Sequence, residues 1–169
     1  LVLLFSICLF TMGPGSNVYR QGEYAIKQLI VPDFDKLPLE RKLYIYYLSK
    51  AVDAGNDIYW QQISKEGLAI RNLFETLYRY SAAFNPIQKA AMEEYMVKIY
   101  SLYGNYHPGK NERFIPDTRV LRFKDLLLMA EIAEEIALEK GDKLEVVEDA
   151  KRLRRDIFSP NYRKTFNIV

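Results

Sequence analysis

The chain has 169 residues, enough for one domain with a stable core, and its apolar fraction of 49% and aromatic fraction of 14% exclude a disordered protein. Its formal net charge of +2 argues against nucleic-acid binding, which requires clustered Lys and Arg. The single cysteine, Cys8, excludes an intramolecular disulfide and a cysteine-rich metal site.

The chain begins with an uncharged apolar run, LVLLFSICLFTM, which is shorter than the ~20 residues needed to span a bilayer. Small residues follow it, as in the apolar region and cleavage site of an export signal. We therefore expect residues 1–16 to be a signal and residues 17–169 to be the folded part. The alternative is that the run is a buried strand or helix of the domain. Because the first residue is Leu1 and the apolar tail Phe166–Val169 carries no stop signal, we expect both ends to be cut.

A short extended segment is predicted over Glu23–Phe34, where the hydrophobic pattern alternates weakly and Pro32 interrupts any helix. The first helix is predicted over Pro38–Ala54, with a connector over Gly55–Ser64. Apolar and aromatic residues surround almost all of this helix and leave only a narrow polar stripe. We therefore expect it to be mostly buried and to be the packing centre of the chain.

Helical spacing of apolar residues predicts the next two helices. One covers Lys65–Ala82. The other begins at Pro86, after the good N-cap Asn85, and ends at Gly104. The residues expected on their buried faces are Ile70, Leu73, Phe74 and Leu77 in the former, and Met92, Tyr95, Met96, Ile99 and Tyr103 in the latter.

Two more helices are predicted after an irregular segment. One covers Leu121–Lys140 and ends at Gly141, and the other begins with a capping box of Asp142 and Glu145 and ends near Asp156. The residues of the last helix expected to face inward are Val147, Ala150 and Leu153. The fold class is therefore predicted as mainly α, with about five helices and a short extended N-terminal segment.

The longest irregular segment is Gly104–Pro116, and it contains the only histidine, His107. Loops of this length are usually functional or disordered. A zinc-peptidase helix needs two histidines and a glutamate, so a structural or solvated role for His107 is preferred over metal binding. Asn105 and Tyr106 follow the helix-ending glycine. They could donate hydrogen bonds to a bound peptide backbone, or satisfy the free carbonyls at that helix end.

Two charged clusters have ordinary structural explanations. Glutamates on one helix share its faces as in a di-iron centre, but the Glu-x-x-His pairs of such centres are missing, so a solvated face is preferred. These are Glu131, Glu134, Glu135 and Glu139. Cations near the end of the last helix are favoured by the helix dipole, with anion or membrane-surface binding as the alternative. These are Lys151, Arg152, Arg154 and Arg155.

Three segments in chain order resemble the dipeptidyl peptidase III-like zinc peptidases. The first is Gln28–Ile58, whose VPDF and YYLSKAVDAGNDI resemble the bacterial elements VPGF and YYLSEAALxGRDI. The second is Tyr100–Pro116, where YSLYGNYHPGKNERFIP resembles YSNxGNYxxxGxTKFVP. The third is Arg154–Thr165, where RRDIFSP resembles the xxIFDP element that precedes the active-site lobe of the family. Together the resemblance covers about Tyr24–Thr165.

The resemblance implies part of a two-lobed α+β enzyme that removes dipeptides from the N-termini of oligopeptides. In the family, zinc held by a histidine-rich helix activates water, with a glutamate as general base. That motif would lie beyond Val169, so we expect no catalytic residue, no metal ligand and no activity in this chain alone, and zinc in the full-length protein. The GNY loop lies near the peptide cleft of the family, so Asn105 and Tyr106 are the candidate substrate-binding residues, with the oligopeptide completed by the missing lobe.

Two departures from the family pattern concern substrate preference. A cleft-wall aromatic of the eukaryotic pattern falls on Gly109, and Ser159 replaces an aspartate. The alternative function is a non-catalytic helical module that binds a peptide or a protein. A third is an incomplete gene product whose exposed apolar surfaces would cause aggregation. The expected location is bacterial and exported, either periplasmic or anchored like a lipoprotein, and cytoplasmic if the N-terminal run is not a signal.

Overall fold

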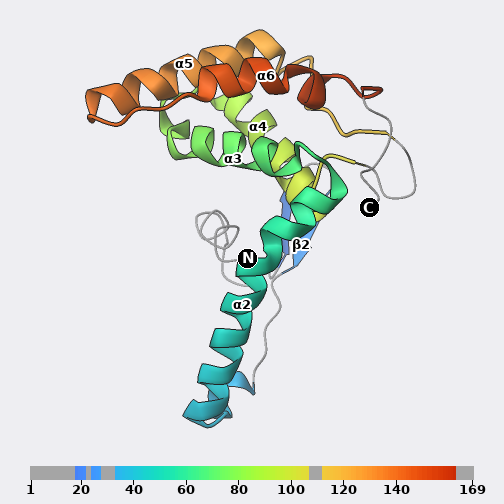
Figure 1. Ribbon diagram of the computed structural model, residues 1–169, viewed down its shortest axis with the longest axis vertical. Coiled ribbons are helices and arrows are strands. Elements are labelled where there is room, and N and C mark those ends of the chain that lie inside the picture. The colour runs from blue at the N-terminus through green and yellow to red at the C-terminus, as the bar shows by residue number, and fades with distance from the viewer. Residues whose placement is uncertain (1–17, 22–23, 28–32, 107–111, 163–169) are drawn as a thin grey trace. The chain divides into compact units, whose positions relative to one another are not determined.

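The computed structural model describes residues 18–21, 24–27, 33–106 and 112–162 (Figure 1). The predicted export signal over residues 1–16, together with His107 and Gly109, lies outside these residues. The described part of the chain is mainly helical, which confirms the predicted class. It divides into two compact units, with the boundary between Asp57 and Ile58.

The five α-helices occur in the predicted order. The α-helices are α2 (Leu39–Ile63), α3 (Gly67–Arg79), α4 (Pro86–Ser101), α5 (Phe123–Glu139) and α6 (Val146–Phe158), and the 3-10 helices are η1 (Phe34–Lys36) and η2 (Ser81–Ala83). Strands β1 (Val18–Gln21) and β2 (Tyr24–Lys27) pair antiparallel. The predicted extended segment is therefore confirmed over β2, whereas Phe34 already belongs to η1. Its residues 23 and 28–32 lie outside the described part of the chain. Within the described residues, no helix is long and apolar enough to cross a bilayer.

Helix α2 differs most from its prediction. It continues through Gly55 to Ile63, so the predicted connector is helical over nearly its whole length. An isolated glycine costs a helix only about 1 kcal/mol, too little to end one that is otherwise well formed. Along α2, Leu39, Tyr44 and Tyr47 are 70%, 69% and 66% exposed. The prediction that this helix is mostly buried and forms the packing centre is therefore wrong.

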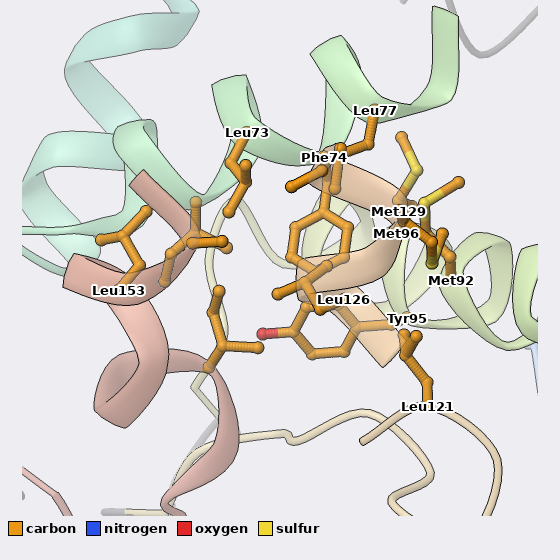
Figure 2. Packing of buried hydrophobic residues seen from close by; sticks show 14 of the residues in the cluster. Leu73, Phe74, Leu77, Met92, Tyr95, Met96, Leu121, Leu126, Met129 and Leu153 are labelled. Carbon is orange, nitrogen blue, oxygen red and sulfur yellow. The ribbon is translucent and has the colours of Figure 1, made fainter. Parts of the chain in front are cut away.

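The second unit contains the core, which is built mainly from α3, α4, α5 and α6. Trp60 from the end of α2 and Phe84, Phe114 and Leu121 from connecting segments complete it. The predicted buried residues of α3 are confirmed, and the Phe74 ring packs on the Tyr95 ring of α4 with centroids 5.1 Å apart. Figure 2 shows these side chains pointing into one cluster, which includes Leu73, Phe74, Leu77, Met92, Tyr95, Met96, Leu126 and Met129. Ile99, Ala150 and Leu153 are buried as predicted, whereas Tyr103 and Val147 are only half-buried.

The two ends of α4 show one confirmed and one wrong prediction. Asn85 caps the helix, because its Oδ1 accepts a hydrogen bond from the Ile87 amide at 2.9 Å. The helix ends at Ser101 rather than Gly104, and the residue with positive φ is Tyr103, at 53°. Gly104 serves packing instead. A Cβ there would lie 2.7 Å from Ile63 Cγ2, so a side chain does not fit without movement.

Helix α5 is terminated by Gly141 as predicted, but helix α6 does not begin with the predicted capping box. Gly141 has φ of +83°, and its amide donates to Leu138 O at 3.0 Å while the Asp142 amide donates to Ala137 O at 2.9 Å. This is the glycine-dependent hydrogen-bond pattern expected at a helix end. The predicted capping box is wrong, because the N-cap residue of α6 is Glu145 and its side chain accepts no hydrogen bond from the backbone of that helix.

The start of α6 is capped from the neighbouring helix. Glu134 Oε1, on α5, accepts a hydrogen bond from the Val147 amide at 2.9 Å. A carboxylate at this end of a helix also interacts favourably with the helix dipole. Glu134, which was predicted to lie on a solvated face, therefore links α5 to α6.

Candidate functional site

The candidate substrate-binding residues Asn105 and Tyr106 are buried, with 1% and 4% of their surface exposed. The segment that contains them folds back on itself, since the Phe114 amide donates to Asn105 O at 2.8 Å and Tyr106 forms a β-bridge with Arg113. Asn105 Nδ2 donates to the backbone carbonyl of Asp156, on α6, at 2.7 Å. The side chain therefore satisfies a carbonyl near a helix end, but one of α6 rather than of the preceding α4.

A buried ion pair joins the same segment to α6. Arg113 Nη1 lies 2.7 Å from Asp156 Oδ1, and the two side chains are 3% and 6% exposed. The other guanidinium nitrogens, Nε and Nη2, donate to Tyr106 Oη at 2.9 and 2.8 Å. Arg113 thus connects the hydroxyl of its bridge partner to a carboxylate in the last turns of α6. We call Asn105, Tyr106, Arg113 and Asp156 the buried polar cluster.

The sequence contains one signal for this cluster, the charge of Asp156. Asp156 places a negative charge near the C-terminus of a helix, where the dipole favours positive charge. A carboxylate in that position indicates a specific partner elsewhere in the chain. Nothing in the sequence near Arg113 distinguishes it from the other charged residues of the irregular segment, so that partner could not be identified in advance.

Tyr95 extends the buried polar cluster into the core. Burial raises the pKa of its hydroxyl well above the ordinary value, and the Asn105 amide lowers it by a smaller amount, so the hydroxyl stays protonated at neutral pH. Tyr95 Oη and Asn105 Oδ1 nevertheless each lack a hydrogen bond of ordinary geometry in the described part of the chain. Buried polar atoms without partners are costly. These two atoms therefore reduce the net stability that the buried polar cluster contributes.

The buried polar cluster is arranged to hold a segment in place. Its charged groups are paired and its polar side chains point into the protein, so it presents no exposed nucleophile or base. Among the residues that the structure describes, no group of three or more His, Cys, Asp or Glu could hold a metal ion. The predicted row of glutamates is dispersed, with Glu134 capping α6 and Glu131, Glu135 and Glu139 exposed.

The cations at the end of α6 separate into two pairs. Lys151 and Arg152 form exposed ion pairs with Glu148 and Asp149, each at 2.7 Å. Arg154 and Arg155 contact rings instead: their guanidinium carbons lie 4.7 Å from the Phe123 centroid and 5.7 Å from the Tyr162 centroid.

Arg154 and Arg155 also line a surface cavity of about 360 Å³, together with residues before and at the start of α5. The other lining residues are Thr118, Arg122, Phe123, Phe158 and Ser159. We call this the arginine cavity. Its location was not predicted, because the two segments that form it are distant in the sequence.

No protein-family model matches the chain, and no curated protein matches it. The resemblance to dipeptidyl peptidase III-like enzymes therefore rests on its three segments alone. Two of those segments meet in the buried polar cluster: Asn105, Tyr106 and Arg113 belong to the second, and Asp156 belongs to the third.

Proposed function

We propose that this chain is the N-terminal part of a zinc-dependent dipeptidyl peptidase of the dipeptidyl peptidase III-like class, with the zinc-binding part outside residues 1–169. In this proposal the chain does not catalyse the reaction itself. It forms part of the wall of the peptide-binding cleft, and the segment that includes Asn105 and Tyr106 contacts the oligopeptide. The observation that supports this most is the ion pair between Arg113 and Asp156, which joins two of the three resembling segments.

The physical argument concerns positioning. A buried ion pair adds little net stability compared with apolar side chains, so its better-attested use is to specify one arrangement. A cleft wall requires such an arrangement, because binding groups must be held within a fraction of an ångström by residues that are themselves fixed. Arg113 and Asp156 fix Asn105 and Tyr106 in this way. Asn105 and Tyr106 are therefore proposed as positioning residues of the peptide-binding segment.

The deciding experiment is the intact mass and zinc content of the protein isolated from its natural source. A mass several times 19.8 kDa, with on the order of one zinc ion per chain, is the expected result. In a parallel assay, purified residues 1–169 with added zinc should release no dipeptides from oligopeptides. A natural protein of 19.8 kDa or slightly less without zinc would contradict the proposal, and so would clear turnover by residues 1–169.

The positioning role is tested in the full-length protein with Asn105→Ala. We expect KM to rise by about tenfold with a smaller change in kcat, because the loss affects binding more than chemistry. The matched control is Asn72→Ala on an exposed position of α3, which should leave both constants unchanged. Thermal melting of both variants separates a binding defect from unfolding. Equal KM values for the two folded variants would contradict the positioning role.

The second candidate is a non-catalytic helical module that binds a peptide or a protein. The observation that favours it is the exposure of large apolar side chains along α2, because contiguous exposed apolar surface usually marks an interaction site. The same mass measurement separates the two candidates. This second function requires a natural protein near 19.8 kDa that holds no zinc and melts cooperatively on its own.

A further inference from the structure

The arginine cavity combines positive charge with apolar walls. It lies where the start of α5 meets the end of α6, and its volume of about 360 Å³ is at the lower end of the range for small-molecule sites. Arg154 and Arg155 reach it from α6, and Arg122 reaches it from the residue before α5. The hydroxyl-bearing residues Thr118 and Ser159 also line it.

Two of the three arginines carry charge that no carboxylate of the described residues neutralises. Arg122 is paired with Asp125 at 2.9 Å, and its guanidinium lowers the pKa of that carboxyl group, which therefore stays ionised. In the described part of the chain, neither Arg154 nor Arg155 has a carboxylate within ion-pair distance, and both contact aromatic rings. The cavity therefore has an excess of positive charge carried by planar groups.

Two aromatic rings line the cavity beside the arginines. The rings of Phe123 and Phe158 lie edge to face, with centroids 6.0 Å apart at an angle of 74°. The Arg154 guanidinium carbon lies over the Phe123 ring, 4.7 Å from its centroid, so the two groups attract each other by a cation–π interaction. A ligand in this cavity would meet N–H donors and ring carbons together.

We propose that the arginine cavity binds a carboxylate attached to an apolar group, as at the C-terminus of a peptide. Planar guanidinium groups match the two oxygens of a carboxylate. Phosphate, which carries more charge, fits less well, because the ionised Asp125 lies beside Arg122 and its Oδ2 already accepts from the backbone amide and Nε of Arg122. The aromatic walls suit the apolar part of the ligand. This inference does not depend on the peptidase proposal.

The test uses the full 169-residue chain and four probes. N-acetyl-leucine has both the charge and the apolar group, N-acetyl-leucinamide lacks the charge, acetate lacks the apolar group, and inorganic phosphate replaces the carboxylate. Binding is measured by calorimetry, and the site is located by NMR shifts of the arginine Nε–H signals. We expect N-acetyl-leucine to bind at least about fivefold more tightly than each other probe, with affinity that falls as salt is added.

Matched variants show which positive charges contribute to the binding of N-acetyl-leucine. Arg154→Gln and Arg155→Gln should each weaken N-acetyl-leucine binding by about fivefold, the modest loss expected for an exposed charge. The control Lys143→Gln removes the same charge from a side chain that is 85% exposed and does not line the cavity, and it should have no effect. Arg154→Lys keeps the charge but not the planar group, so it should bind between wild type and Arg154→Gln.

Each other outcome overturns the proposal. Equal affinity for the acid and its amide would show that charge is not recognised, and equal affinity for acetate would show that the walls contribute nothing. Tighter binding of phosphate would make the cavity a phosphate site. Absence of binding, or equal losses in Lys143→Gln and the two arginine variants, would show that the cavity is not a specific site. Thermal melting confirms that each variant is folded.

Discussion

Helices α2 and α3 are both rich in apolar residues, yet they have opposite environments. In α3 the apolar residues form one stripe, and Ile70, Leu73, Phe74 and Leu77 are all at most 2% exposed. In α2 the apolar residues surround the helix. Of the residues that the structure describes in α2, Trp60 alone is buried. An apolar stripe predicts which face of a helix packs on the core. Apolar residues on all sides of a helix predict burial but not the direction of the partner.

The difference shows what periodicity can and cannot predict. A single stripe implies one partner surface, which the chain supplies locally through α4, α5 and α6. An all-round apolar pattern predicts burial only when a partner is present on every side. Side chains such as Leu39 and Tyr47 remain exposed, so the sequence of α2 is consistent with a partner that has yet to be identified.

The largest expected effect comes from truncating a core residue of α3. Phe74→Ala should lower the free energy of unfolding by about 3–5 kcal/mol, because the ring is fully buried against Tyr95 and leaves a cavity. The matched change on α2 is Tyr47→Ala, which should stay within about 0.5 kcal/mol. Urea denaturation followed by circular dichroism measures both. A large loss for Tyr47→Ala would mean that this face of α2 is covered in solution.

Breaking the buried polar cluster should lower the free energy of unfolding nearly as much as Phe74→Ala does. Asp156→Ala leaves the charge of Arg113 buried without its partner, and we expect a loss of about 3 kcal/mol in the free energy of unfolding. The control is Glu148→Ala at the other end of α6, whose ion pair with Lys151 is exposed and should contribute less than about 1 kcal/mol.

A double replacement distinguishes the charge from the shape of the site. Arg113→Met combined with Asp156→Leu removes both charges, and it should restore most of the stability lost in Asp156→Ala. Denaturant unfolding is again the measurement. If the double variant is no more stable than the single one, then the hydrogen bonds to Tyr106 and to the Asp156 carbonyl carry the energy rather than the ion pair.

Two glycines extend the comparison to the backbone. Gly104→Ala should lower the free energy of unfolding by about 1–3 kcal/mol, because the new Cβ would lie 2.7 Å from Ile63 Cγ2. Gly55→Ala lies inside α2, where a new Cβ would meet no atom within 4 Å apart from its chain neighbours and the backbone of its own helix, and it should raise stability by about 0.5–1 kcal/mol. Thermal melting of both variants shows whether each substitution raises or lowers stability. A loss for Gly55→Ala would indicate that α2 needs a break there.

The elements that sequence reasoning identified are those whose information is local. The apolar stripe of α3, the Asn85 cap and the glycine that ends α5 each depend on a few neighbouring residues, and each was predicted correctly. The missed features depend on distant partners. The role of Gly104 requires Ile63, and the cap of α6 requires Glu134 from another helix.

The candidate site divides in the same way. The irregular segment was identified from its composition, and Asn105 and Tyr106 were selected by resemblance. Their anchoring by Arg113 and Asp156 was not predicted, because the hydrogen bond from Asn105 to the Asp156 carbonyl joins residues 51 positions apart. Pairings at that distance leave no periodic pattern in a single sequence. The substrate-binding role of Asn105 and Tyr106 stays a prediction.

A further small effect tests the hydrogen bond that links α5 to α6. Glu134→Ala removes the acceptor of the Val147 amide, and it should lower the free energy of unfolding by about 1 kcal/mol, as loss of a helix cap does. Glu135→Ala, the exposed neighbour on the same helix, should change stability by no more than about 0.5 kcal/mol. Hydrogen exchange at the Val147 amide should accelerate in the first variant and not in the second. Equal exchange rates would mean that the first turn of α6 is held by the packing of Val146 in the core, and that the carboxylate of α5 adds nothing to it.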